Sequence, residues 1–150
     1  MQINILTGGF KVIYTGKIDE VSWSPIIKTN LIERANISND AKADIFISIH
    51  LNTFKIESVK GTETFYNEKS SQSKYLSELI QAQIIKDVNS NDRGIKTERF
   101  SVFRNVKAPA VLVELGYITN PDEEILLNTS SYQEKLAAAM AKGILNYFKQ

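Results

Sequence analysis

The sequence predicts an α/β fold in which a mostly parallel, twisted sheet is flanked by helices. Strand-like and helix-like segments alternate along the chain, which is typical of a sheet with helices on its faces. Two strand-like segments, residues 43–49 and 109–114, are strongly apolar, as expected for strands buried on both sides. The chain of 150 residues is 43% hydrophobic and 23% charged, which indicates one globular domain.

The N-terminal segments predict the end of a helix, a strand and a loop. Residues 1–7 precede Gly8 and Gly9, and glycine readily adopts the left-handed backbone conformation that ends helices. Residues 10–14 alternate in polarity and contain β-branched side chains, so they predict a strand. Residues 15–28 contain glycine and proline and predict a loop.

A helix and two strands are predicted next. Asn30 and Glu33 have the spacing of a capping box, which predicts a helix over residues 31–40. The first apolar strand then ends at His50, the single histidine of the chain. After a polar connection, residues 61–66 show the alternation of a half-buried strand.

The middle of the chain predicts an amphipathic helix, a turn and two strands. The apolar side chains of residues 71–88 recur at helical spacing, which predicts a helix lying on the sheet. Residues 89–94 have the composition of a turn, and residues 100–104 predict a short strand. Pro109 stands at the first position of the second apolar strand, where the missing backbone donor costs least.

Two helices are predicted near the C-terminus. Asn120 supplies a capping side chain, and Pro121 is well suited to the first position of a short helix. Ser131 and Glu134 form a second capping box, and residues 132–148 predict a final helix with one apolar packing face.

Composition argues against several classes of function. The formal net charge of +1 gives no general reason to expect a nucleic-acid partner. The chain has no cysteine, so it has neither a disulfide framework nor a thiolate metal site. No apolar run is long enough to span a bilayer, and the polar start lacks the features of a signal peptide. We expect a monomer with no nucleic-acid partner, membrane span or signal peptide.

His50 and Glu114 stand at the ends of the two apolar strands. Open α/β sheets bind ligands at the carboxyl ends of their strands, so both residues are candidates for chemistry. A histidine with a carboxylate suggests metal-assisted hydrolysis, yet a catalytic zinc usually has three protein ligands and this chain offers one imidazole. On its position alone, His50 also fits a partly buried histidine that is satisfied by a backbone carbonyl.

Five motifs carry a resemblance to a known family. From about Gly9 to the C-terminus, the chain resembles the zinc-dependent N-acetylmuramoyl-L-alanine amidases that hydrolyse bacterial peptidoglycan. This resemblance implies a mostly parallel six-stranded sheet flanked by helices. It also implies cleavage of the amide between the lactyl group of N-acetylmuramic acid and the first L-alanine of the stem peptide. The motifs lie in residues 33–36, 43–52, 61–66, 93–96 and 109–120.

The resemblance implies a zinc ion bound by His50 and two further residues. In the family, these are a histidine in an Asp-Pro-Gly-His-Gly-Gly loop after the first strand and a glutamate on the first helix. That strand, that loop and most of that helix would lie upstream of Met1, and the family's arginine after the next strand is replaced by Gly16. Residues 1–150 are therefore expected to be an N-terminally incomplete amidase catalytic domain. Glu114 would take a proton from zinc-bound water and pass it to the leaving amine.

Three further residues are predicted to contact substrate: Asn52, Glu63 and Arg93. Asn52 follows His50 and can orient the loop there or hydrogen-bond the substrate. Glu63 lies on a predicted strand, where a solvated or cross-strand position is an equal alternative. Arg93, with Lys96, can meet the carboxylates of a stem peptide, although charges in a turn more often serve solubility.

Two functions remain open. The first is a zinc amidase acting outside the cell at the wall, as an autolysin or a phage endolysin, with carboxylates such as Glu63 or Asp19 able to complete the metal site. The second is a catalytically inactive pseudo-amidase that binds peptidoglycan or a partner through the same cleft. A metal-free hydrolase using Glu63 and Glu114 ranks last, because it needs their side chains within roughly 5 to 10 Å.

Overall fold

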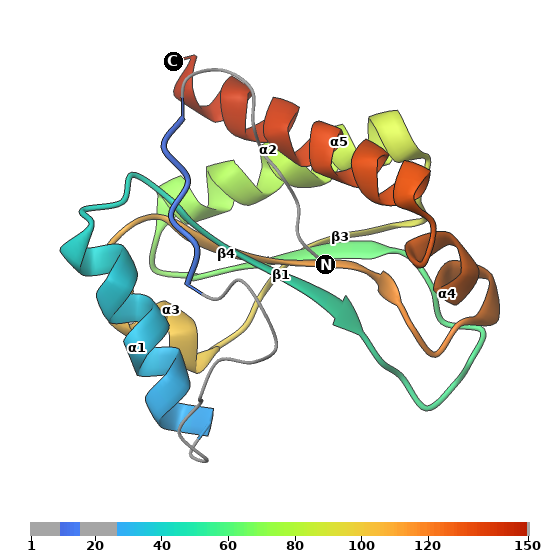
Figure 1. The fold of residues 1–150 in the computed structure, drawn as a ribbon, viewed down its shortest axis with the longest axis horizontal. Helices are drawn as coiled ribbons and strands as arrows, with labels where there is room; N and C mark the ends of the chain where they lie inside the picture. Colours follow the sequence, from blue (N-terminus) through green and yellow to red (C-terminus); the bar gives the residue numbers. More distant parts are fainter. Residues whose placement is uncertain (1–9, 16–26, 150) are drawn as a thin grey trace.

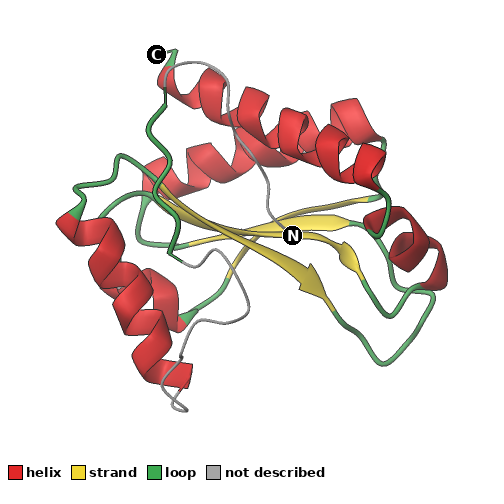
Figure 2. Cartoon of the chain, viewed as in Figure 1, coloured by secondary structure: helices red, strands yellow, loops and turns green. Residues whose placement is uncertain are grey.

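A computed structural model describes residues 10–15 and 27–149, and in them a sheet of four strands lies between two layers of helices (Figure 1). Figure 2 shows the twist of the sheet and the helices on both of its faces. The elements in chain order are α1 (Ile27–Asp40), β1 (Phe46–Asn52), β2 (Thr62–Tyr66), α2 (Ser71–Val88), β3 (Asp92–Thr97), α3 (Ser101–Asn105), β4 (Ala110–Tyr117), α4 (Pro121–Leu127) and α5 (Ser130–Phe148).

The sheet has the strand order β1-β4-β2-β3. The pairs β1 with β4 and β2 with β3 are parallel, whereas β2 runs antiparallel to β4. The predicted α/β class with a mostly parallel sheet is confirmed. The resemblance implied six strands, and the described part of the chain contains four.

The central strand β4 contributes to a separate core on each face of the sheet. Val111, Val113 and Leu115 pack with α2 and α5 in the larger core. Ala110 and Leu112 point to the opposite face and pack with α3 and with Leu31 of α1. Because side chains alternate along a strand, Glu114 belongs to the same face as Leu112. Its β4 neighbours therefore place Glu114 on the face that carries α1 and α3 (Figure 1).

Helix α2 is fixed to the sheet by buried polar contacts as well as by its apolar side chains. Gln81 donates hydrogen bonds to the Thr62 carbonyl oxygen at 2.8 Å and to Asp92 Oδ1 at 2.7 Å. Its side-chain oxygen accepts a hydrogen bond from Thr64 Oγ1 at 2.8 Å. Each buried polar atom of Gln81 thus has a partner, which holds β2 and β3 against the same helix turn.

Several predicted element boundaries are wrong. Helix α1 begins at Ile27, so Asn30 lies inside the helix and is not its cap. Strand β1 runs from Phe46 to Asn52 and β4 runs from Ala110 to Tyr117, so His50 and Glu114 lie within their strands rather than at the ends. Residues 10–14 do not form a strand, and residues 1–9 lie outside the described residues. Strand formation depends on pairing with other segments, which a local alternation of side chains does not supply.

Two segments have a different secondary structure from the predicted one. Residues 101–105 form a helix that buries Val102 and Phe103, and the Phe103 ring packs edge to face against Phe100 with ring centroids 5.6 Å apart. The predicted turn over residues 89–94 contains the start of β3, in which Gly94 has a φ of +75°. Helix α5 begins at Ser130 after Thr129, so Ser131 is not its cap. Among the described residues, no helix is long and apolar enough to cross a membrane.

Candidate active site

His50, Glu114 and Glu63 form one row across three neighbouring strands. His50 on β1 is in register with Glu114 on β4, and Glu114 is directly opposite Glu63 on β2. Side chains in register on adjacent strands point to the same face of a sheet. The structure therefore brings together the two residues that the sequence predicted for the reaction and Glu63, to which the other two residues predicted for substrate, Asn52 and Arg93, are hydrogen-bonded.

One carboxylate oxygen of Glu114 lacks a hydrogen-bond partner among the described residues, and the pKa of this side chain is raised. Its Oε2 atom is buried and accepts no hydrogen bond from the described residues. Burial, and then the nearby negative charge of Glu63, raise the pKa of Glu114 to about 7. Both effects disfavour the ionised carboxylate. Such a group both accepts and donates a proton near neutral pH, which is what general acid–base catalysis needs.

The raised pKa of Glu114 predicts that this residue opposes folding more strongly as the pH rises. The folded chain retains the Glu114 proton up to a pKa of about 7, whereas the unfolded chain loses it near 4.5. Between these values the folded state binds more protons, so the contribution of Glu114 to the free energy of unfolding falls as the pH rises. The free energy of unfolding is measured with urea at pH 5 and pH 8 for Glu114→Gln and the wild type. The value for Glu114→Gln minus the value for the wild type should be larger at pH 8 than at pH 5. Equal differences at the two pH values would contradict the shift.

His50 is a neutral imidazole at neutral pH. Desolvation, and then the positive charge of Arg34, lower the pKa of His50 below its ordinary value. The hydroxyl of Ser48, two residues earlier on the same strand face, lies 2.9 Å from His50 Nε2. A hydroxyl rather than a backbone carbonyl is thus the recorded partner. A neutral imidazole is also the form that binds a metal.

Glu63 receives hydrogen bonds from all three other strands of the sheet. Its carboxylate accepts from Asn52 Nδ2 at 2.9 Å, from the Tyr117 hydroxyl at 2.8 Å, from Arg93 Nε at 3.2 Å and from Lys96 Nζ. Burial alone would raise the pKa of Glu63, but the bonds from Lys96 and Tyr117, the charge of Lys96 and the bond from Arg93 together lower it. Glu63 is therefore ionised although it is only 3% exposed.

Tyr117 joins the site through an irregularity in β4. His50 pairs with Glu114 and Asn52 pairs with Tyr117, so β4 uses three residues where β1 uses two. This bulge brings Tyr117 to the face of Glu114, where its hydroxyl reaches Glu63. Burial, and then the hydrogen bond and charge of Glu63, raise the pKa of Tyr117 to about 12. The sequence did not reveal this role of Tyr117, because a bulge is visible only in the strand register.

Glu123 fixes the backbone around the site. Its Oε1 accepts a hydrogen bond from the Gly61 N–H at 2.9 Å, just before β2, and its Oε2 accepts one from the Tyr117 N–H at 2.7 Å, at the end of β4. The Asn120 side chain accepts from the Glu123 N–H at 3.1 Å, which confirms the predicted helix cap. One buried carboxylate therefore ties α4 to both neighbouring strands.

The described residues offer ligand atoms of the types that bind zinc, but too few of them. They provide one imidazole at His50 and one unpaired carboxylate oxygen on Glu114, while Glu63 is committed to two cations. Within residues 10–15 and 27–149, no three His, Cys, Asp or Glu side chains are grouped to hold a metal. A catalytic zinc site needs three protein ligands. A zinc ion at His50 thus requires ligands outside the described residues, where Asp19 also lies.

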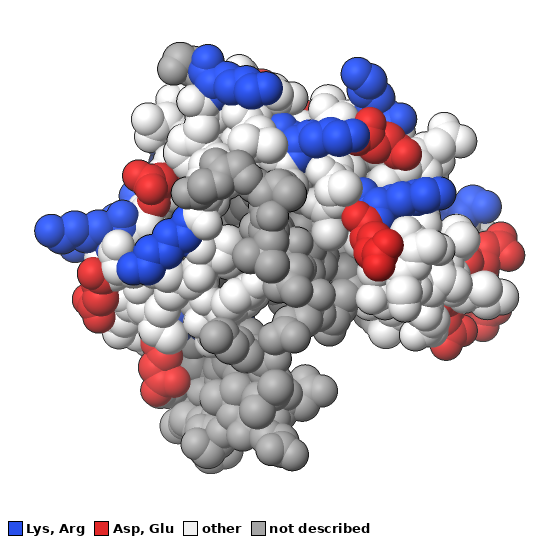
Figure 3. Space-filling model, turned by 45° about the horizontal axis from the view of Figure 1, so that its top comes forward, with Lys and Arg blue, Asp and Glu red and all other residues white. Residues whose placement is uncertain are grey.

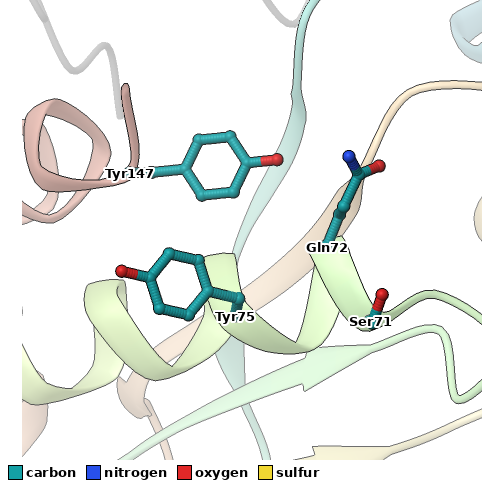
Figure 4. Close-up of a pocket in the computed structure, with 4 residues that line it drawn as sticks. All are labelled: Ser71, Gln72, Tyr75 and Tyr147. Atoms are coloured by element: carbon teal, nitrogen blue, oxygen red, sulfur yellow. The ribbon is translucent and has the colours of Figure 1, made fainter. Parts of the chain in front are cut away.

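A pocket lies away from this row, between the N-terminal part of α2 and the last turn of α5. It measures about 380 Å³ and is lined by Ser71, Gln72, Tyr75 and Tyr147 (Figure 4). The ring centroids of Tyr75 and Tyr147 lie 6.0 Å apart at this pocket. None of its lining residues belongs to the row on the sheet. On the face seen in Figure 3, basic and acidic side chains are interspersed among the described residues.

Comparisons with known proteins agree with the fold and identify the family. The model of the N-acetylmuramoyl-L-alanine amidase family matches residues 2–146. N-acetylmuramoyl-L-alanine amidase LytC of Bacillus subtilis (strain 168) is 36% identical over 141 residues, which are 93% of this chain and 28% of LytC. The endolysin of Bacillus phage SPP1 is 40% identical over 121 residues, which are 76% of this chain and 44% of the endolysin.

A solved structure gives the same result. The crystal structure of N-acetylmuramoyl-L-alanine amidase from Clostridium difficile 630 superimposes with a TM-score of 0.78 at 38% identity, covering 80% of this chain and 66% of that one. The chain thus spans less than two thirds of the length of these relatives. Because the family match covers nearly every residue, including the row of His50, Glu114 and Glu63, the chain belongs to the N-acetylmuramoyl-L-alanine amidase family.

Proposed function

We propose that this chain carries the hydrolytic centre of a peptidoglycan amidase, which cleaves the amide between N-acetylmuramic acid and L-alanine. The observation that carries this proposal is the buried, unpaired Oε2 atom of Glu114, whose carboxyl group has a pKa of about 7 and lies in register with His50. Family membership supplies the substrate class. The names of two relatives, an N-acetylmuramoyl-L-alanine amidase and a phage endolysin, support action on peptidoglycan outside the cell.

In this proposal, Glu114 moves the protons of the reaction. Its ionised carboxylate accepts a proton from the attacking water, whose oxygen bonds to the carbonyl carbon of the lactyl group. Glu114 then donates that proton to the alanine nitrogen as the C–N bond breaks. The products are a lactyl carboxylic acid and a stem peptide with a free L-alanine amino group. Asn52, Glu63 and Arg93 form the polar network on the substrate side of Glu114.

The assay for this function follows the new amino groups. Purified chain is incubated with peptidoglycan and with zinc salt, and released L-alanine amino termini are labelled and identified. The amidase proposal expects amino termini on alanine and no new reducing sugar ends. New reducing ends, which a glycosidase would produce, contradict it, as does the absence of both products at every enzyme concentration tested.

Zinc is the cofactor we propose, with His50 as the ligand that this chain contributes. Support comes from the family and from the neutral imidazole of His50. Elemental analysis after dialysis against a weak chelator should find about one zinc ion per chain in the wild type and far less in His50→Ala, because metal affinity depends on each ligand. Zinc that stays bound in His50→Ala would mean that the metal lies elsewhere.

The second candidate is a pseudo-amidase that binds peptidoglycan without cutting it. The specific observation in its favour is that the described residues include no group of three metal ligands. Sedimentation with insoluble peptidoglycan separates the two candidates. Binding without zinc and without released amino termini favours the pseudo-amidase, whereas binding with release favours the enzyme.

A further inference from the structure

Strand β3 contains one extra residue relative to β2. Thr62 pairs with Asp92 and Thr64 pairs with Ile95, so three steps on β3 match two steps on β2. Gly94 lies at this bulge with a φ of +75°, and its N–H donates to Asp92 Oδ1 at 2.8 Å. Bulges are uncommon between parallel strands, and they re-aim side chains next to functional sites. The bulge therefore changes which β3 side chains share a face.

The consequence is that Arg93 and Lys96 point to the same face of the sheet. In a regular strand, residues three apart point to opposite faces. Here both side chains reach the carboxylate of Glu63, which lies in the row with Glu114. The bulge thus delivers two cations to the side of the sheet on which the amide is proposed to be cut.

Arg93 and Lys96 together carry more positive charge than is required to neutralise the carboxylate of Glu63. Glu63 is one negative charge whose side chain is 4% exposed, whereas the side chains of Arg93 and Lys96 are 31% and 40% exposed. Arg93 uses only its Nε for Glu63, and its guanidinium lies over the ring of Tyr117 at 5.2 Å from the centroid. The Arg93 side chain also hydrogen-bonds to the Tyr117 side chain, so Glu63 and Tyr117 together hold the guanidinium in place. The cluster therefore presents an oriented and partly exposed positive charge.

We infer that Arg93 and Lys96, held in place by Glu63, form a subsite for a carboxylate of the stem peptide. Arginine is suited to this role because its planar fork matches the two oxygens of a carboxylate. Glu63 acts here as a positioning residue, since four hydrogen bonds already occupy its own oxygens. The inference rests on the proposed function, because it takes the peptide of peptidoglycan as the ligand.

The test uses two synthetic N-acetylmuramoyl peptides that are identical except that one carboxyl group near the L-alanine is converted to an amide. Binding to the full chain is measured by calorimetry at a fixed pH and low salt. The carboxylate peptide should bind about 10-fold more tightly than the amide peptide, as a charge-assisted hydrogen bond predicts. Equal affinities overturn the subsite and leave the amidase proposal intact. No binding of either peptide also overturns the subsite, and the assay for released amino termini tests the amidase proposal by itself.

Variants separate a binding role from a structural one. Arg93→Gln and Lys96→Gln should each reduce the preference for the carboxylate peptide, while affinity for the amide peptide changes little. Lys74→Gln is the matched control, because Lys74 is an exposed cation on α2 that pairs with Glu78 at 3.8 Å, away from the row. It should keep the full preference. An equal loss of affinity for both peptides in Arg93→Gln and Lys96→Gln would show that the cations only support the fold, and would overturn the inference.

Discussion

Replacing Glu114 with glutamine is expected to lower the rate of amide hydrolysis by about 10²–10⁴-fold, the usual contribution of a positioned acid–base group. Glutamine keeps the size of the side chain but neither accepts nor releases a proton at neutral pH. Initial rates of alanine amino-group release, at saturating peptidoglycan and fixed zinc, measure the effect.

Two controls make this result specific to Glu114. Glu78→Gln removes an exposed carboxylate from α2 and should leave the rate unchanged. Binding of Glu114→Gln to insoluble peptidoglycan should equal that of the wild type, which shows that the variant is folded and still recognises its substrate. A variant that hydrolyses the amide within a few fold of the wild-type rate would remove Glu114 from the proposed mechanism.

The pairing of His50 with Glu114 could be anticipated from the sequence, because both residues belong to strongly apolar strands. A polar side chain in a buried strand has few roles other than chemistry or a buried contact. The structure buries β4 in this way, whereas β1 lies at the edge of the described sheet, with Ile49 and Leu51 exposed. The structure adds the register, which places the two residues opposite each other. The helix over Ser71–Val88 was predicted with its observed bounds for a similar reason, since its apolar spacing is long and regular.

The rest of the site depends on pairings that no local pattern contains. Tyr117 and Lys96 reach Glu63 only because β4 and β3 each carry a bulge, and a bulge is defined by the partner strand. The Arg93-Gly94 segment has the composition of a turn, so sequence reasoning placed no strand there. The acidity of Glu114 likewise depends on Glu63, which is distant in sequence and opposite in space. The contacts of Glu63 and the raised pKa of Glu114 therefore depend on the register between strands, which local sequence patterns do not contain.

Glu123→Gln is expected to destabilise the chain by about 1–3 kcal/mol, the cost of leaving a buried donor unsatisfied. The two carboxylate oxygens accept hydrogen bonds from the Gly61 N–H and the Tyr117 N–H, and Glu123 is only 8% exposed. The amide of glutamine offers one oxygen and one NH₂ group, so one of the two backbone donors faces another donor. Urea unfolding followed by circular dichroism measures the loss.

Glu124→Gln is the matched control, because Glu124 is the next residue of the same helix turn and is exposed. Both substitutions remove one negative charge from the N-terminal turn of α4, so both lose a similar interaction with the helix dipole. The control should stay within about 0.5 kcal/mol of the wild type, as surface substitutions usually do. The difference between the variants then reports the two buried hydrogen bonds that join α4 to β2 and β4. Equal stability of the two variants would show that Glu123 contributes only its charge.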